Sequence, residues 1–543
     1  MILDTSPHGE RRSRWSRPPR SRAISLAALA GLWLLALARP GAGQIIEPWS
    51  LGTGVDPRPG VPRARLEAMG GMREAVPDEN NEINLLDFGG NLVGHLDDKP
   101  THHLDAWGGW RGWVDRTTPE TPDQDFRIYP AGFLGNALPN DRYAIGGSMK
   151  LASGGGERVV TDQFLRLFGL PVANPESGSN VGTTLSSDLV GADFTAHYAR
   201  RLTERISFGL LGGYQSQDEE RVAATTYDLD NDAHTWAAKG SVVGRLFAQA
   251  GPFTDWVLGL NGVLGDTRID GVSADDLHTD EYTWDRNSWG MNVHLLGDVA
   301  GWAKGGLDFR YGSFEGQESA SYNWSAQYSL NPTSETILET RTVHEEGYRD
   351  SGFLTRWEVT PPDLPASFGF GFNAGQTEYW VLPGTNVNSF VTARSQQVTA
   401  WEATGGGTYF LPRGRGLLAG EMVWGWSDRD ERISPPTERV GASSFELGTG
   451  GEYAVAMPLV ARAGYRYIRD DENRDRDDPA GESSAHRLAL GAGYRTASGA
   501  LSLDLAFSYD WVSSEAEEPG VGDEVVEDKD RKLVTLQLRS LFF

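Results

Sequence analysis

The sequence predicts an all-β protein, a transmembrane antiparallel up-and-down β-barrel. Apolar and polar residues alternate along many segments, and short turns alternate with long polar connections. The chain carries 18 Trp, 17 Tyr, 21 Phe and 67 Gly, yet no apolar run after residue 43 is long enough for a membrane helix. In a membrane barrel alternate side chains face lipid and lumen, so these features are expected together.

The alternation is clearest near the carboxyl end. Leu503, Leu505 and Phe507 alternate with Asp504 and Ser508. Successive side chains of a strand point to opposite faces, so one face is apolar and the other polar. We therefore expect the leucines and the phenylalanine to contact lipid and the polar residues to face the lumen.

The connections fall into two length classes that alternate along the chain. The expected short turns lie near 201–204, 250–252, 298–301, 361–364, 412–415, 456–458 and 497–499. The expected long polar loops lie near 217–233, 268–284, 428–441, 469–483 and 513–530. Outer-membrane barrels have short periplasmic turns and long extracellular loops, whereas a soluble β-sandwich has no reason to sort its loops by length.

Counting alternating segments from residue 141 to residue 543 gives about 16 strands, with about 14 or 18 as alternatives. The stretch 319–346 is either an additional hairpin or an extracellular ribbon. Residues 44–140 alternate poorly and are rich in Pro, Gly and Asp. We expect them to form a periplasmic extension, a first hairpin or a plug.

Residues 1–43 have the layout of a secretory signal peptide. Arginines precede an apolar run at 23–38, and small residues follow it. Gly41-Ala42-Gly43 and Ala36-Leu37-Ala38 are both plausible cleavage sites. The alternative is a membrane anchor, for which the apolar run is short of the ~20 residues required. We therefore expect the protein to be exported and to be located in the outer membrane.

Composition excludes several classes of function. The net charge is −26, and residues 1–43 contribute +5, so the remainder carries about −31. Such acidity argues against a nucleic-acid partner. There is no Cys and no Gly-x-Ser-x-Gly elbow, and the isolated lumen histidines His197 and His294 lack an evident nucleophile. We expect no enzyme activity, no cofactor and no metal site.

The last residues, Leu533 to Phe543, form an alternating segment that ends on two phenylalanines. This end resembles the terminal strand of Gram-negative outer-membrane barrels, including the porins, whose assembly machinery recognises the terminal aromatic residue. The resemblance implies that machinery, outer-membrane lipids and lipopolysaccharide as partners. We expect Val534, Leu536 and Leu538 to face lipid.

A second resemblance concerns residues 83–98. Asn91-Leu92-Val93-Gly94 is similar to the Asn-Pro-Ala-Gly/Leu stretch in the lumen-facing amino-terminal segment of the long-chain fatty-acid transporter family. Leu92 replaces the proline of that pattern. The resemblance implies an internal plug and uptake of hydrophobic substrates.

The expected lumen face carries charges of both signs. The candidate pore-lining residues are Lys239, Arg245, Asp255, Asp308, Arg310, Arg356, Glu402, Glu421, Glu446, Glu452, Arg462, Arg466, Arg487, Arg495 and Asp504. Basic residues concentrate on 459–495 and acidic ones on 398–452. Opposed charged walls orient solutes in a water-filled pore, but the same charges could pair and seal the lumen.

The sequence therefore predicts an outer-membrane channel or transporter for small solutes. Two alternatives remain open: fatty-acid-transporter-like uptake of hydrophobic substrates past a plug, and a non-transporting barrel that works through its surface loops. The pattern does not specify the solute.

Overall fold

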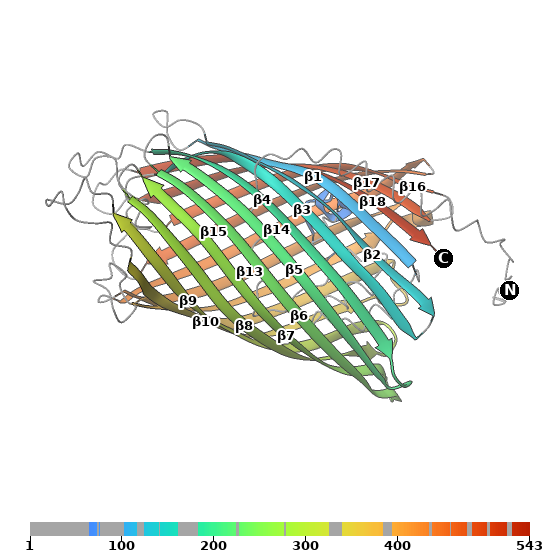
Figure 1. Ribbon diagram of the computed structural model, residues 1–543. Helices are drawn as coiled ribbons and strands as arrows, with labels where there is room; N and C mark the ends of the chain where they lie inside the picture. The colour runs from blue at the N-terminus through green and yellow to red at the C-terminus, as the bar shows by residue number, and fades with distance from the viewer. Residues whose placement is uncertain are drawn as a thin grey trace, which may run out of the picture.

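The computed structural model describes one antiparallel β-sheet and a short helical segment (Figure 1). It describes residues 64–72, 75, 102–116, 124–140, 142–160, 183–223, 227–275, 278–324, 339–383, 394–433, 437–456, 458–474, 481–496, 500–517 and 524–542. The expected signal peptide at 1–43, the plug-like motif at 83–98 and Phe543 lie outside these residues.

Within this part of the chain the sheet has 18 strands. The first nine are β1 (His102–Arg116), β2 (Gln124–Asn140), β3 (Tyr143–Val160), β4 (Thr183–Arg201), β5 (Ile206–Ala223), β6 (Tyr227–Ala250), β7 (Phe253–Asp275), β8 (His278–Val299) and β9 (Ala303–Trp324). The others are β10 (Glu339–Val359), β11 (Ala366–Pro383), β12 (Arg394–Phe410), β13 (Gly416–Ile433), β14 (Thr437–Ala456), β15 (Leu459–Arg474), β16 (Gly481–Arg495), β17 (Leu501–Glu517) and β18 (Glu524–Phe542). A 3₁₀ turn, η4 (Pro412–Gly414), lies between β12 and β13, and the helix α2 (Ala64–Glu67) precedes β1.

Each strand pairs antiparallel with its neighbours in sequence, and the first strand also pairs with the last. The register of β1 against β18 runs from His102 opposite Phe542 to Arg116 opposite Asp528. Since β1 also pairs with β2 and β17 with β18, the sheet closes on itself. Closure leaves no edge strand with unpaired backbone groups, the condition for a sheet inside a membrane. The predicted up-and-down barrel is confirmed.

The outer surface of the barrel carries an apolar belt. On β16 Leu490 is 60% exposed, whereas its neighbour Ala489 is 1% exposed. Leu503, Leu505 and Phe507 on β17 are exposed in the same alternating way. A continuous apolar outer face is the surface that a transmembrane barrel presents to lipid. The expected assignment of outward and inward residues near the carboxyl end is confirmed.

The terminal strand follows the same rule. Val534, Leu536 and Leu538 stand opposite Phe507, Leu505 and Leu503 in the β17–β18 register. Residues directly opposite each other in a sheet share a face. The expected outward set on the terminal strand is therefore confirmed by its pairing partners.

The strands are much longer than a membrane crossing requires. They run from 15 residues in β1 to 24 in β6, against the ~9–11 residues that cross a bilayer. The loop expected at 217–233 is wrong in consequence, because β5 continues to Ala223 and β6 starts at Tyr227. The other four expected long loops shorten likewise. Polar side chains mark where the lipid ends, while the backbone ladder continues beyond that point.

The amino-terminal half settles two alternatives that the sequence left open. The barrel starts at residue 102 rather than 141, because β1 and β2 lie in the wall as the first hairpin that was one expectation for residues 44–140. The 18 described strands match the higher of the alternative strand numbers. Trp107 obscured the alternation of β1, since this large aromatic residue points inward, is 1% exposed and packs over Gly132. Pro130 within β2 also argued against a strand there.

The stretch 319–346 extends β9 and β10 at its two ends and adds no separate hairpin among the described residues. The short turns occur where expected, as between β6 and β7 at 251–252 and between β8 and β9 at 300–302.

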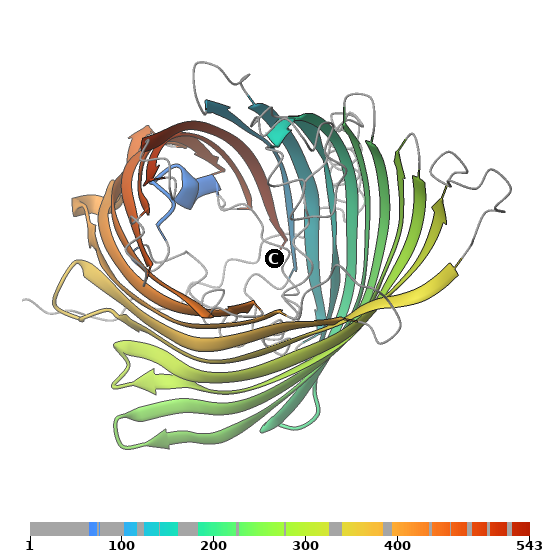
Figure 2. The same cartoon turned by 90° about the vertical axis from the view of Figure 1, so that its left-hand side faces the viewer.

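The helix α2 lies inside the barrel. Figure 2 looks into one end and shows α2 in blue, enclosed by the strands of the carboxyl-terminal half. Among the described residues no helix is long and apolar enough to span a membrane.

Candidate functional site: a lumen with an anchored amino-terminal segment

The segment 64–72 and Ala75, here called the inner segment, packs against the inner face of strands β12 to β17. Leu66, Met69 and Met72 form one buried cluster with Leu417 and Ala419 of β13. Met69 is fully buried. Ala64 and Ala68 form a second cluster with Ala506 of β17. The inner segment is thus held by apolar contacts on two sides.

Inward-facing glycines make room for this segment. A Cβ atom on Gly464 or Gly450 would overlap the backbone of Met69, and these two glycines are register partners on β15 and β14. A Cβ atom on Gly491 would overlap Ala68. The wall is therefore shaped by sequence to admit a backbone at close range.

Two further glycines end the helix. Gly70 and Gly71 have φ of +89° and +72°. The amide of Gly71 donates to the carbonyl of Leu66 at 2.8 Å. A left-handed glycine of this kind is a common helix C-cap, so the chain turns here along the wall.

The first ion-pair cluster links the inner segment to three strands. The Nε atom of Arg65 lies 2.9 Å from Oε2 of Glu452 on β14. The same oxygen accepts a hydrogen bond from Nε of Arg462 on β15 at 2.7 Å. Nη1 of Arg462 donates to Asp504 on β17 at 2.6 Å. Charges of opposite sign alternate along this chain of contacts.

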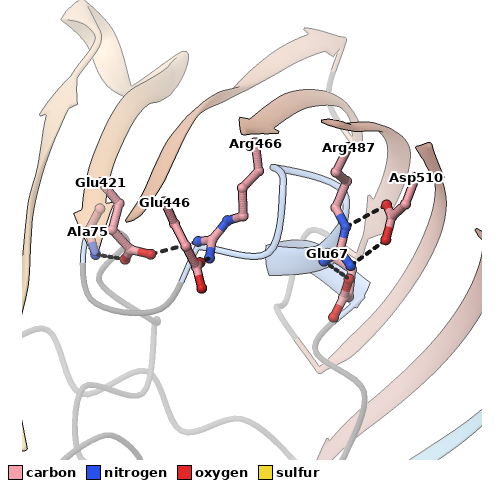
Figure 3. Close-up of polar contacts among 7 residues, drawn as sticks. All are labelled: Glu67, Ala75, Glu421, Glu446, Arg466, Arg487 and Asp510. Carbon is pink, nitrogen blue, oxygen red and sulfur yellow. Dashed lines mark hydrogen bonds and ion pairs between the residues drawn. The ribbon is translucent and has the colours of Figure 1, made fainter. Parts of the chain in front are cut away.

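The second cluster surrounds Arg466 (Figure 3). Its Nη2 atom donates to Glu421 on β13 at 2.7 Å, and its Nη1 atom pairs with Glu446 on β14. Glu421 also accepts the backbone amide of Ala75 at 3.1 Å. The hydroxyl of Thr408 on β12 donates to the carbonyl of Ala75. Both backbone groups of Ala75 are therefore bonded to the wall.

The third cluster is centred on Arg487 of β16 (Figure 3). Its Nε and Nη2 atoms donate to the two oxygens of Asp510, each at 2.7 Å. Nη1 lies 3.8 Å from Glu67 of the inner segment. Arg466 and Arg487 stand opposite each other in the sheet. Each has its own carboxylate partner, which offsets the repulsion between like charges.

These contacts show that the charges on the wall of β13 to β17 are paired. The side chain of Arg462 is fully buried and that of Arg466 is 4% exposed. Removing one partner from a buried, hydrogen-bonded ion pair leaves a charge without compensation, at a cost of about 3–5 kcal/mol. On this wall the charges pair and hold the inner segment in place.

The remaining inner wall, on β6 to β12, is also polar. Lys239 and Asp308 are both more than nine-tenths buried. Asn292 donates to Asp308 at 2.9 Å, and Arg310 lies 3.8 Å from Asp350. Among the described residues none belongs to a group of three or more His, Asp or Glu that could hold a metal ion.

The structure places most candidate lumen residues on the inner face. Those in the ion-pair clusters are Glu421, Glu446, Glu452, Arg462, Arg466, Arg487 and Asp504. Those on the inner face outside these clusters are Lys239, Asp308, Arg310, Arg356, Glu402 and Arg495. Their contact with water in an open pore stays a prediction.

Two candidates lie at the rim instead. Arg245 and Asp255 flank the short turn between β6 and β7, with side chains 49% and 61% exposed and 3.9 Å apart. The register shifts between Thr254 and Val257, and Asp255 has φ of +51°. This bulge takes Asp255 out of the regular alternation, so parity does not assign it to the inner face. A pore-lining role for this pair stays a prediction.

The candidate pore-lining residues did not include Arg65, Glu67 and Asp510. Alternation along β17 does place Asp510 on the polar, inward face together with Asp504. The signal at Arg65 and Glu67 was a short helix-forming run, Ala64-Arg-Leu-Glu-Ala-Met69, ended by Gly70 and Gly71. That run predicts a helix, but it does not predict which strands of the barrel the helix contacts.

Comparison with known proteins gave structural likenesses alone: no family model and no curated sequence matches. The toluene transporter TodX of Pseudomonas putida has TM-score 0.33 and 9% identity, over 88% of this chain and 98% of that one. A FadL homologue of Pseudomonas aeruginosa has TM-score 0.35 and 12% identity over the same shares. The ferric citrate transporter FecA has TM-score 0.40 and 10% identity, over 80% of this chain and 78% of that one.

Proposed function

We propose that this protein is an outer-membrane channel or transporter for small solutes. The observation that carries the proposal is the contrast between the two faces of one closed sheet. The outer face is an apolar belt, while the inner face holds buried residues such as Lys239, Asp308 and Glu421. A membrane barrel with a charged interior has the chemistry of a solute pathway.

The inner segment defines the route. It is fixed to strands β12 to β17 by three ion-pair clusters and two apolar clusters. In the proposal, solutes pass along the wall of β6 to β12, which the described part of the inner segment contacts at Gly406 and Thr408, near the short-turn end of β12. The protein would be exported through its signal peptide, reach the barrel-assembly machinery through the terminal strand, and sit among lipopolysaccharide and phospholipid.

Planar-bilayer recording of the purified protein tests this function. We expect discrete conductance steps from protein that migrates as a folded, heat-modifiable barrel. Liposomes containing it should swell in small sugars. Folded protein that gives neither conductance nor swelling would refute the channel and favour the non-transporting barrel.

A second candidate is uptake of hydrophobic substrates past an internal plug. The observation that favours it is the apolar side of the inner segment, where Leu66, Met69 and Met72 pack against β13. A plug that is held in the barrel partly by apolar contacts suits a transporter that moves the plug as its substrate passes. Substrate-dependent uptake of a hydrophobic probe by protein that shows no ion conductance would support this candidate over the channel.

A further inference from the structure

An apolar groove of about 760 Å³ lies on the outer face of the barrel, across β4 to β8. The exposed residues that line it face away from the lumen, and Leu210, Leu264 and Trp289 are 54%, 66% and 44% exposed. The strands that carry the groove lie side by side in the barrel wall (Figure 1). The groove is therefore separate from the lumen and from the inner segment.

Small residues form the floor of the groove. Ala196 on β4, Gly212 on β5 and Ala238 on β6 stand in one register row. Gly240 on β6 and Gly262 on β7 pair in the next row. A Cβ atom on Gly212 or Gly262 would meet no atom within 4 Å. The outer face is therefore hollow across four strands, or about 14 Å at ~4.8 Å between neighbouring strands.

Larger outward side chains form the two walls of the groove. On the long-loop side are Phe194, Tyr214 and Trp236, and the rings of Tyr214 and Trp236 are 4.3 Å apart. On the short-turn side the exposed residues Val242 and Leu260 pair with each other. In a membrane a hollow between apolar walls takes an alkyl chain rather than water.

A cluster of arginines lies at the β4 end of the groove. Arg142, Arg200, Arg201 and Arg205 stand in or beside the short turns that follow β2 and β4. The two turns are joined, because the amide of Arg201 donates to the carbonyl of Arg142 at 2.8 Å. Glu204 is the acidic residue described there, so the described part of these turns has a net charge of +3, in a chain whose net charge is −26.

Arg200 stands on the outer face, at the level of an aromatic cluster. It pairs in the sheet with Tyr143 on one side and Phe208 on the other. Tyr198, which lines the groove, has its ring centroid 6.4 Å from that of Tyr143 and 5.9 Å from that of Phe208. Aromatic girdles mark the two interfaces of a membrane barrel. Arg200 is therefore at the depth of lipid headgroups, beside one end of the groove.

The charge of this cluster is available to a ligand. Arg200 and Arg205 are exposed, and in the described part of the chain no acidic side chain forms an ion pair with either guanidinium group. Guanidinium groups bind phosphate oxygens in a bidentate manner. Exposed guanidinium groups at the end of an apolar groove match an amphiphile that carries a phosphate.

We propose that this face of the barrel binds a phospholipid of the periplasmic leaflet. Its phosphate would pair with Arg200 and Arg205, and one acyl chain would lie in the groove over Gly212 and Ala238. The volume of the groove falls within the ~300–1,000 Å³ of small-molecule sites. The site requires a barrel in a membrane but no transport, so it goes beyond the proposed function.

Native mass spectrometry of the detergent-purified protein, titrated with dioleoylphosphatidylglycerol, tests the proposal. We expect saturable retention of this lipid on the folded barrel. Dioleoylglycerol, which has the chains without the phosphate, should bind about tenfold more weakly because the charge-assisted contacts are absent. Glycerol phosphate, which has no chains, should not be retained. Equal binding of the two lipids, retention of glycerol phosphate, or no retained phospholipid overturns the proposal.

Three variants, each compared as a folded, heat-modifiable barrel, locate the site. Arg200→Gln with Arg205→Gln should weaken phosphatidylglycerol binding about tenfold and leave dioleoylglycerol binding unchanged. Gly212→Leu should weaken the binding of both lipids, since it fills the floor where an added Cβ has no neighbour. The control, Arg413→Gln with Arg415→Gln, removes two exposed arginines from a short turn outside the groove and should keep wild-type binding. Equal losses in the two double variants, or wild-type binding in Gly212→Leu, would place the lipid elsewhere.

The competing occupant of the groove is a second copy of the chain. Lipid-free dimers in the same spectra that dissociate in Gly212→Leu would assign the groove to that contact and refute the lipid site. The measurement needs no conduction, so the two proposals fail separately. Lipid binding without conductance refutes the channel and keeps the site, and conductance without lipid binding does the reverse.

Discussion

At the scale of single residues, Arg466 shows how a charge is tolerated inside this barrel. It is nearly fully buried and shared between Glu421 and Glu446. We expect Arg466→Ala to lower the free energy of unfolding by about 3–5 kcal/mol, because two carboxylates lose their cation. Urea unfolding of the folded barrel in detergent measures the change.

The matched control is Arg469→Ala on the same strand. Arg469 is 44% exposed and pairs with Asp471 at 3.0 Å, and an exposed pair contributes at most about 1 kcal/mol. Replacing Arg466, Glu421 and Glu446 together by Met, Gln and Gln should recover most of the loss. A similar small cost at both arginines would show that the ion pairs on this wall are solvated.

A second residue-scale prediction concerns the lipid face. Leu505→Glu should destabilise the barrel by about 2 kcal/mol, since a charge would enter the bilayer. Ser502→Glu on the same strand should be neutral or slightly stabilising, because Ser502 faces inward opposite Arg495. Refolding equilibria in liposomes compare the two variants. Equal effects would mean that the inward and outward faces are assigned wrongly.

At the scale of elements, the inner segment is positioned by glycines on the wall. Gly464→Ala places a methyl group on the backbone of Met69. We expect the segment to detach while the barrel stays folded, so trypsin should cleave after Arg65 faster than in the wild-type protein. Mass spectrometry of the fragments measures this.

The control is Gly262→Ala on β7, where the added Cβ would have no neighbour within 4 Å. This variant should keep the wild-type cleavage rate. Continued protection of Arg65 in Gly464→Ala would show that the close approach of Met69 is not what holds the segment.

The elements also show what the sequence could and could not predict. Side-chain parity assigned residues such as Arg462, Arg487 and Asp504 to the inner face correctly, because alternation is a local property of a strand. Parity did not show where β5 and β6 stop pairing, since the backbone ladder continues where side chains become polar. It also failed at β1, where Trp107 points inward.

The contacts of the inner segment could not be predicted from the sequence, because they depend on the folded barrel. Arg65 and Glu452 are 387 residues apart in sequence, and their bond depends on the curvature that brings β14 around α2.

At the scale of the whole molecule, the inner face has two parts that differ in their contacts. The wall of β13 to β17 pairs its charges and holds the inner segment, whereas the wall of β6 to β12 carries polar and charged side chains such as Lys239 and Asp308. The proposed pathway therefore has one side fixed by the inner segment and one polar side.

The most direct test of the pathway uses the absence of cysteine from the chain. Ala400 and Ala403 lie on the same strand, but Ala400 stands in the inward row and Ala403 pairs with the outward residues Phe372 and Trp424. Each is replaced singly by Cys, and conductance is recorded while a charged, membrane-impermeant thiol reagent is added. The account predicts that the reagent lowers the conductance of Ala400→Cys and leaves that of Ala403→Cys unchanged. Unchanged conductance in Ala400→Cys, with labelling confirmed by mass, would contradict a solute pathway along this wall.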